Sequence, residues 1–488
     1  MKLNTSQPSF SSYQRDTHFY DEIFSENNEV KEVYKTLLNL YSEHTVQDFA
    51  RLNEKAKASF FNQGITFQVY GEHETKEKIF PFDLFPRIID HKEWSHIEKG
   101  VLQRRKALNH FLWDIYHDKK ILKQGIVPID LINSSANYLD QMQGLNPPGG
   151  IYNHISGTDL IKHSDGKYYV LEDNIRCPSG VSYVICNRTA LKRALFGVFN
   201  HYQTHTVTDY AENLLEIMES VKPHGVDAPT CVVITPGIYN SAYYEHSYLA
   251  KAMGVELVEG RDLFVENDFV YMRTINGAQK VDVIYRRIDD TFMDPLEFRP
   301  DSTLGVPGLL AAYKLGNVCL VNAPGTGVAD DKAIYTYMPQ IIKYYLGEEP
   351  ILSNVHTYHC HRPDELKYVL DNIENLVIKP VDEAGGYGIS IGNKLTKEEI
   401  ENVKKVIKEN PRKYIAQPIM SLSVHATYIE DSKSFEPRHV DLRTFCLLGK
   451  DKSFVLKGGL TRVALKKGNL IVNSSQGGGS KDTWVLKK

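Results

Sequence analysis

The segment YYVLEDNIRCPSG, residues 168–180, is the part of the sequence that most constrains the fold. Its first residues suit a β-strand, yet Glu172, Asp173 and Asn174 follow directly, and strands disfavour Asp and Asn. A stretch with Pro and Gly then ends the strand. A cluster of acceptors in this position either faces water on a solvated hairpin or holds a cation, and the residues upstream of it bear on that choice.

The dipeptide Asp165-Gly166 lies just upstream and is a strong signal for a two-residue hairpin turn, because both central positions of such a turn need positive φ. That turn would place Asp159 directly opposite Glu172, with Asn174 on the same face of the hairpin. Strand alternation then predicts that Asp173 points to the other face. A three-residue turn would instead put Asp159 and Glu172 on opposite faces.

Two opposed carboxylates repel each other, so this arrangement costs stability unless a cation lies between them. Two carboxylates and an amide oxygen suit Mg²⁺, which usually takes one or two carboxylates and completes its coordination with water and phosphate. The candidate metal ligands are therefore Asp159, Glu172 and Asn174.

Phosphate-binding residues have to come from elsewhere, because the sequence contains neither a P-loop nor a well-formed dinucleotide fingerprint. The stretch LVIKPVDEAGGYGISIG places Lys379 on a strand, ahead of a turn formed by Gly385, Gly386, Tyr387 and Gly388. Glycine lets backbone N–H groups close on phosphate oxygens, and a nearby lysine adds charge. A simple glycine-rich hairpin tip is the alternative interpretation. Residues that could complete a triphosphate clamp are Lys332, Arg443 and Arg462. The strand that carries Gln417 could bind an adenine edge through its backbone, and Asp441 lies two residues before Arg443.

At 488 residues the chain should form several domains, and alternating strands and helices between 228 and about 325 predict a small parallel α/β domain. Its sites should lie at the carboxyl ends of the strands. Arg286 and Arg287 follow one such strand and are candidates for binding a substrate carboxylate, although a strand-end pair of arginines also suits a salt bridge. Asp441 could be a metal ligand or a salt-bridge partner, and His154 a base or a core residue.

Composition narrows the class of protein. The net charge of −4 does not suggest a nucleic-acid-binding protein, which normally carries a basic face. The six cysteines form no C-x-x-C pair, which fits reduced thiols in the cytosol better than a disulfide framework. The N-terminal segment lacks the apolar core of a signal peptide, and no window approaches the roughly 18 apolar residues of a membrane span. We expect a soluble, cytoplasmic protein without nucleic-acid or membrane partners.

The order of these motifs resembles the ATP-grasp superfamily: two lysines with a glycine loop, a strand carrying Gln417, and then two arginines. That superfamily normally finishes with a hairpin whose Asp, Glu and Asn bind magnesium, and this chain stops without one. The matching hairpin, TDLIKHSDGKYYVLEDN, lies far upstream. The sequence therefore resembles a circularly permuted ATP-grasp protein of type 2, related to the synthetase domain of glutathionylspermidine synthase.

The resemblance implies an α/β (α+β) fold, with an ATP-grasp core in permuted order. Residues 1–225 would form a helical N-terminal region together with the metal-binding hairpin at about 151–190. Residues 226–325 would form a pre-ATP-grasp parallel α/β domain, and residues 326–488 the ATP-binding part of the core.

The resemblance also implies residue roles. Metal ligands would be Glu172, Asn174 and Asp159; ATP contacts would come from Lys332, Lys379, Gln417 and a lid loop at Gly385, Gly386, Tyr387 and Gly388; Arg443 and Arg462 would be catalytic and face the γ-phosphate or an acyl-phosphate. The implied activity is an ATP- and Mg²⁺-dependent ligase that joins a small-molecule or peptide carboxylate to an amine through an acyl-phosphate. Two alternatives are a phosphotransferase that uses the same site and a nucleotide-binding partner protein that has lost turnover.

Overall fold

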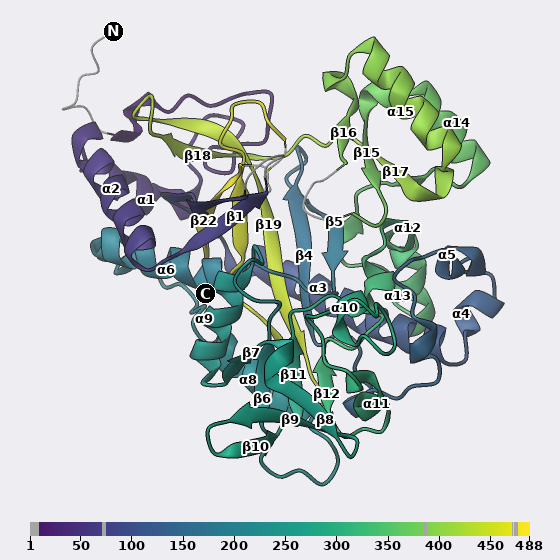
Figure 1. Ribbon diagram of the computed structural model, residues 1–488. Coiled ribbons are helices and arrows are strands. Elements are labelled where there is room, and N and C mark those ends of the chain that lie inside the picture. The colour runs from purple at the N-terminus through teal and green to yellow at the C-terminus, as the bar shows by residue number, and fades with distance from the viewer. Residues whose placement is uncertain (1–8, 71–74, 384–387, 471, 473–476) are drawn as a thin grey trace.

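The computed structural model describes residues 9–70, 75–383, 388–470, 472 and 477–488. The fold is a mixed α/β arrangement, as predicted (Figure 1). Long strands run through the middle of the molecule, a lobe with α14 and α15 lies at the upper right, and a parallel sheet lies at the bottom. Within the described part of the chain, no helix is both long enough and apolar enough to cross a membrane.

The central sheet combines strands from both ends of the chain. Its order is β13, β5, β4, β19, β21, β22 and β3, with β18 and β20 also paired to β19. The long strand β19, Ser434–Leu448, lies antiparallel between β4 and β21. The other strands are β3 Phe82–Ile89, β4 Ile155–Lys162, β5 Tyr168–Asn174, β13 Ser353–Asn354, β18 Val424–Ile429, β20 Ser453–Val455, β21 Leu460–Val463 and β22 Gly479–Val485.

The turn between β4 and β5 differs from the prediction, because it contains three residues instead of two. The N–H of His163 donates to the carbonyl of Lys167, and the N–H of Gly166 donates to the carbonyl of His163, both at 2.9 Å. Gly166 has φ +74°, a conformation that glycine adopts without a steric penalty. By itself, a turn of this length would have moved the predicted metal ligands to opposite faces.

A β-bulge restores the predicted pairing. β5 carries one extra residue, Leu171, so that the register shifts and Asp159 does lie opposite Glu172. Asn174 is opposite Gly157, two positions along, and shares the face of Glu172. The predicted pairing is therefore correct, although the turn length from which it was derived is wrong.

A smaller sheet forms the core of the upper lobe, with the order β14, β17, β15 and β16. Helices α14 and α15 contribute Val369, Ile400 and Ile407 to its apolar core. α15 begins with a capping box in which Thr396 and Glu399 satisfy each other's backbone N–H groups. The bounds are β14 Tyr358–His359, β15 Leu376–Pro380, β16 Ser390–Ile391, β17 Tyr414–Pro418, α14 Pro363–Asp371 and α15 Lys397–Glu409.

The segment predicted as a parallel α/β domain forms a parallel sheet with the order β12, β11, β6 and β7. An antiparallel unit of β8, β9 and β10 extends from it. The bounds are β6 Cys231–Ile234, α9 Tyr243–Met253, β7 Glu256–Val258, β8 Leu263–Glu266, β9 Phe269–Thr274, β10 Gly277–Lys280, β11 Val283–Arg286, α10 Asp290–Met293, α11 Leu309–Lys314 and β12 Cys319–Val321.

The N-terminal region is not only helical, since its strand β3 pairs parallel with the C-terminal strand β22 in the central sheet. The sequence analysis predicted neither strand, because β3 is buried on both faces and shows no polar–apolar alternation, and β22 buries charged residues. In β22, Lys481 pairs with Asp83, and Asp482 pairs with Arg188. Other elements here are α1 Glu32–Ser42, α2 Val46–Asn62, β1 Thr66–Tyr70, β2 Thr75–Ile79, α3 His91–Tyr116, α4 Lys120–Lys123 and α5 Ile129–Asn133.

One apolar core joins the central sheet to the parallel sheet. It contains Val184 from α6, Leu214 from α8, Val233 from β6 and Phe445 from β19. Because the two sheets share a core, the parallel α/β unit packs directly against the central sheet. The remaining helices are α6 Val181–Ala194, α7 Phe196–Phe199, α8 Tyr210–Ser220, α12 Lys332–Tyr335 and α13 Met338–Leu346.

Candidate active site

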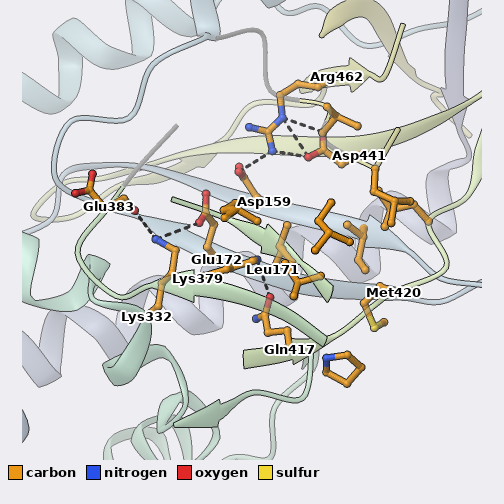
Figure 2. Close-up of a pocket in the computed structure, with 18 of the residues that line it drawn as sticks. Asp159, Leu171, Glu172, Lys332, Lys379, Glu383, Gln417, Met420, Asp441 and Arg462 are labelled. Carbon is orange, nitrogen blue, oxygen red and sulfur yellow. Dashed lines mark hydrogen bonds and ion pairs between the residues drawn. The ribbon is translucent and has the colours of Figure 1, made fainter. Parts of the chain in front are cut away.

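A cleft lies between the central sheet and the smaller sheet of the upper lobe (Figure 2). It holds about 920 Å³ of space outside protein atoms, part of which is open to solvent. Its apolar wall includes Ile161, Leu171, Val377, Ile391, Met420 and Leu422. Predicted site residues that line it are Asp159, Glu172, Lys332, Lys379, Gln417 and Arg462. Segments that are distant in sequence thus contribute to one cavity with an apolar side and a charged side.

The charged side comes from neighbouring strands whose register brings their polar residues together. Glu172 on β5 lies opposite Asp159 on β4, and Asp159 lies opposite Arg443 on β19. Asp441, two residues from Arg443 and therefore on the same face, lies opposite Arg462 on β21. Three carboxylates and two guanidinium groups therefore lie close together across this part of the sheet, and Asp159 and Asp441 each have an arginine as a close partner.

The Asp159 carboxylate is bound by both predicted catalytic arginines. Arg443 donates from Nε at 2.6 Å and from Nη2 at 2.8 Å, and Arg462 donates from Nη2 at 2.7 Å. Burial by itself would raise the pKa of Asp159, but the charges of Arg443 and Arg462 lower this pKa below its usual value. The group is therefore an anion whose two oxygens both accept from arginine. Arg462 also binds Asp441, which identifies Asp441 as a salt-bridge partner.

Glu172 is less constrained than Asp159. Its oxygens lie 3.8 Å from Arg443 Nη2 and 3.8 Å from Lys332 Nζ, and the amide nitrogen of Asn174 is 3.4 Å from Oε1. Separations near 3.8 Å are too long for hydrogen bonds, so this carboxylate keeps free coordination capacity. Its side chain is 26% exposed at the edge of the cleft.

Glu172 and Asn174 suit a magnesium site that is completed by water and phosphate better than a site made only of protein groups. Within the described ranges, no cluster of three or more His, Cys, Asp or Glu residues could hold a metal. Mg²⁺ typically takes one or two carboxylates and completes its coordination with water and phosphate oxygens, which suits one free carboxylate and one amide oxygen. The third predicted ligand, Asp159, is already occupied by arginine N–H groups.

Two lysines from different elements line the cleft. Lys332 begins α12 and donates to the carbonyl of Glu383 at 2.6 Å. Lys379 on β15 is buried and donates to the side-chain oxygen of Gln417 at 2.6 Å, and Gln417 in turn donates to Thr357 at 2.9 Å. Burial lowers the pKa of Lys379 to about 8, although the charge of Glu172 opposes this shift. The hydrogen-bond partner of Lys379 is therefore neutral, so that within the described part of the chain the positive charge of the protonated lysine is not paired with a carboxylate by a hydrogen bond.

The predicted lid loop lies mostly outside the described residues, since Gly385, Gly386 and Tyr387 fall within the gap at 384–387. Gly388 at its end is exposed, with φ +68°, and a Cβ there would lie 2.7 Å from the ring of Pro380. The positive φ and the close approach to Pro380 explain why glycine occupies this position. The ATP-binding role of the loop stays a prediction.

Arg286 and Arg287 are buried and bonded within the protein. Arg286 donates to the carbonyl of Ile288 at 2.7 Å and pairs with Asp290 at 2.8 Å. Arg287 donates to the carbonyl of Pro178 at 2.8 Å and also bonds the hydroxyl of Ser179. Neither arginine is among the residues that line the cleft, and the substrate-binding role stays a prediction for both.

His154 does not line the cleft either. It is fully buried, and burial together with the charge of Arg105 lowers its pKa to about 3. A neutral histidine inside the core has no route to a substrate amine, so its position favours the core-residue interpretation.

The sequence analysis missed the apolar wall of the cleft, including Leu171. In a regular strand Leu171 and Glu172 would point to opposite faces, yet both line the cleft, because the bulge at Leu171 breaks the alternation. A bulge has no local sequence signal that alternation could reveal. Glu172, by contrast, is a predicted site residue, and it does line the cleft.

Comparison with known proteins identifies the family to which this chain belongs. The model of a family described as circularly permuted ATP-grasp type 2 matches residues 86–464. An uncharacterized protein of Synechocystis sp. is 50% identical over 96% of this chain and 97% of its own length. An uncharacterized protein of Mycobacterium tuberculosis is 49% identical over 96% of this chain and 84% of its own length.

A relative from Frankia alni, whose printed name is "Putative glutamate--cysteine ligase 2-3", is 37% identical over 96% of this chain. This chain spans only 54% of that protein's length, so its name describes a much larger molecule. Among solved structures, an apo glutathione synthetase-like effector from Globodera pallida matches with a TM-score of 0.58. The match covers 90% of this chain and 97% of the effector at 12% identity, which shows a shared fold.

Proposed function

The chain belongs to the circularly permuted ATP-grasp type 2 family, and on that premise we propose that it is an ATP-dependent ligase that joins a carboxylate to an amine. The observation that carries the proposal is the composition of the cleft. Lys332, Lys379, Glu172 and an apolar wall meet in one cavity between two sheets, and Asn174 lies beside Glu172, with its amide nitrogen 3.4 Å from Oε1. The relative with glutamate–cysteine ligase in its name agrees with this class of reaction at a coarse level.

We assign the apolar wall to the adenine ring and the charged side to the triphosphate. Lys379 can exchange its neutral partner Gln417 for a phosphate oxygen, and Lys332 can exchange the carbonyl of Glu383 in the same way. Charge–charge contacts in a cleft that excludes water are stronger than these neutral ones. The two lysines would therefore hold the triphosphate between the sheets.

Glu172 and Asn174 would hold Mg²⁺ at the boundary between the triphosphate and the second substrate. When bound, the ion would neutralise negative charge on the phosphate oxygens. Arg462 and Arg443 would stabilise the charge that develops on the transferred phosphoryl group, with Asp159 fixing the orientation of both guanidinium groups.

The reaction needs positioning more than covalent chemistry by the protein. A carboxylate oxygen of the acid attacks the γ-phosphorus, ADP leaves, and the resulting acyl-phosphate reacts with the amine to give an amide and inorganic phosphate. Since no protein nucleophile takes part, the role of the chain is to align the two substrates and to exclude water.

The test is ADP release by the full-length protein in a screen of acids with and without amines. We expect release that depends on both substrates, a mass-spectrometric amide product, and a loss of at least about 100-fold in Glu172→Ala. Glu401→Ala, an exposed position on α15, is the matched control and should retain wild-type turnover. Unchanged turnover in Glu172→Ala would exclude the assigned metal site, and a stable phosphorylated product formed without amine would indicate a phosphotransferase instead.

A further inference from the structure

Arg104 is a buried arginine that lies outside the cleft yet is bonded to the strand that carries the candidate metal ligands. It projects from α3 and is 1% exposed. Its Nε lies 3.2 Å from each carboxylate oxygen of Asp173, and its Nη2 donates to the same carboxylate. The hydroxyl of Thr158 on β4 also donates to the Asp173 carboxylate, at 3.1 Å. Asp173 is therefore held by two elements on the side of β5 that faces away from the cleft.

This anchor matters because Asp173 lies between Glu172 and Asn174. Neighbouring strand residues point to opposite faces, so fixing the Asp173 side chain fixes the rotation of the strand and the direction of both of its neighbours. Asp173 does point away from the face of Glu172, as strand alternation predicted. The bulge just before it makes the strand irregular, and an irregular strand needs such an anchor more than a regular one.

The same guanidinium group also contacts the helix that carries Lys332. Its Nη1 donates to the side-chain oxygen of Asn354 at 2.7 Å, and Asn354 donates to the carbonyl of Tyr335 at 2.9 Å. Tyr335 is the last residue of α12, which begins at Lys332, and its hydroxyl donates to the carbonyl of Val170 on β5 at 2.5 Å. Arg104 thus links β5 to α12 through Asn354, in addition to the direct bond from Tyr335 to Val170.

We propose that Arg104 is a positioning residue that sets Glu172 and Asn174 at a fixed distance from Lys332, and so aligns the metal with the phosphates. The inference rests on the proposed function, because it assumes the assigned metal ligands and phosphate lysine. Arginine is required because one planar group binds a carboxylate through two nitrogens and an amide through a third, whereas lysine offers a single nitrogen. Groups that orient metal ligands from behind typically change metal affinity by 10–100-fold when they are replaced.

The experiment measures Mn²⁺ binding to the full-length protein by electron paramagnetic resonance in the presence of the ATP analogue AMP-PNP. We expect Arg104→Lys to bind Mn²⁺ about tenfold more weakly than the wild type. The matched control is Arg188→Lys, because Arg188 is 3% exposed and pairs with Asp482 on β22 without lining the cleft. The control should lose thermal stability to a similar extent but keep its Mn²⁺ affinity within about twofold.

Each outcome decides the inference. Wild-type Mn²⁺ affinity in Arg104→Lys, with a lowered melting temperature, would overturn it and leave Arg104 as a purely structural group. No Mn²⁺ binding by the wild-type protein would overturn both this inference and the proposed function, so the two failures are distinguishable. If Arg104→Lys does not fold, Asn354→Ala removes the link from Arg104 to α12 and leaves the bonds between Arg104 and Asp173 in place. It should weaken binding of Mn²⁺ with AMP-PNP severalfold, and an unchanged affinity would overturn the inference.

Discussion

Asp159 and Glu172 lie opposite each other, but their partners give them different roles. Asp159 is fully engaged by two arginines, whereas Glu172 has no partner closer than 3.4 Å among the bonds of the described residues. Two opposed carboxylates are tolerated because arginine charges neutralise one of them and leave the other free to bind a cation. At the residue scale, the site therefore separates a carboxylate bound by arginines from the carboxylate that we propose as a metal ligand.

Replacing Asp159 tests this division. In Asp159→Asn, the half-buried Arg443 and the buried Arg462 lose a shared buried anion, and removing one partner of a buried ion pair typically costs about 3–5 kcal/mol. We expect the free energy of unfolding in urea to fall by this amount. Asp165→Asn, at the exposed turn of the same hairpin, should change it by no more than about 0.5 kcal/mol. Equal stability of the two variants would contradict the role given to Asp159.

Lys379 predicts a proton linkage. Its pKa of about 8 means that the free protein carries a mostly neutral lysine at pH 9 and a charged one at pH 6.5. A bound triphosphate favours the charged form and raises this pKa, so binding should take up a proton at pH 9 and almost none at pH 6.5. Calorimetry of Mg·ATP binding in buffers with different ionisation enthalpies measures the uptake.

Lys379→Arg is the control for this linkage, because arginine stays charged throughout the pH range. The variant should bind Mg·ATP without the extra proton at pH 9. The same proton uptake in both proteins would show that Lys379 does not contact the triphosphate.

At the element scale, the irregular hairpin decides which residues enter the cleft. A three-residue turn and a one-residue bulge compensate each other, so that the pairing of the carboxylates is kept while Leu171 joins Glu172 at the cleft wall. One strand thereby supplies an apolar surface and the proposed metal ligand at consecutive positions. A regular strand could supply only one of them to this face.

Shortening Leu171 should separate these two contributions. In our proposal Leu171→Ala removes apolar contact with the adenine ring, and losing up to about 1.5 kcal/mol of burial corresponds to roughly tenfold weaker binding of AMP-PNP. Leu171→Met keeps the apolar volume and should remain within about twofold of the wild type. Both proteins should bind Mn²⁺ normally. Unchanged nucleotide affinity in Leu171→Ala would place the ring elsewhere.

At the scale of the whole molecule, the candidate site exists only where distant parts of the chain meet. The hairpin β4–β5, helix α12 and strands β15, β19 and β21 each contribute residues to the cleft, and α3 from the N-terminal region supports them from behind (Figure 1). The parallel α/β unit contributes no residue to the cleft lining, and its arginines fix the structure around β11 and the loop at Pro178.

A substitution of Arg286 tests whether this arginine stabilises the fold or binds the acid substrate. In Arg286→Lys, charge-assisted bonds to the carbonyls of Ile288 and Asn322 are lost, so the free energy of unfolding should fall by at least about 2 kcal/mol. The KM for the acid substrate should not change. A raised KM at an unchanged melting temperature would instead support the substrate-binding role predicted from the sequence.

Local pattern was sufficient for part of the site. Alternation in the acidic strand predicted the direction of Asp173, and the order of the motifs led to the permuted family, because both features depend only on neighbouring residues and their sequence order. The parallel sheet followed from the spacing of strands and helices. The turn length was predicted wrongly, and only a compensating bulge kept the carboxylate pairing correct.

The amino-acid sequence by itself thus determined the family, the fold class and the opposed carboxylates of the β4–β5 hairpin. Tertiary structure alone decided that Asp159 binds two arginines, that Leu171 enters the cleft and that Arg104 supports the strand from behind. The physical reason is sequence distance. The partners of the Asp159–Arg443 bond are 284 residues apart, and such a contact depends on which strands become neighbours in the sheet, a choice made by the packing of the whole chain.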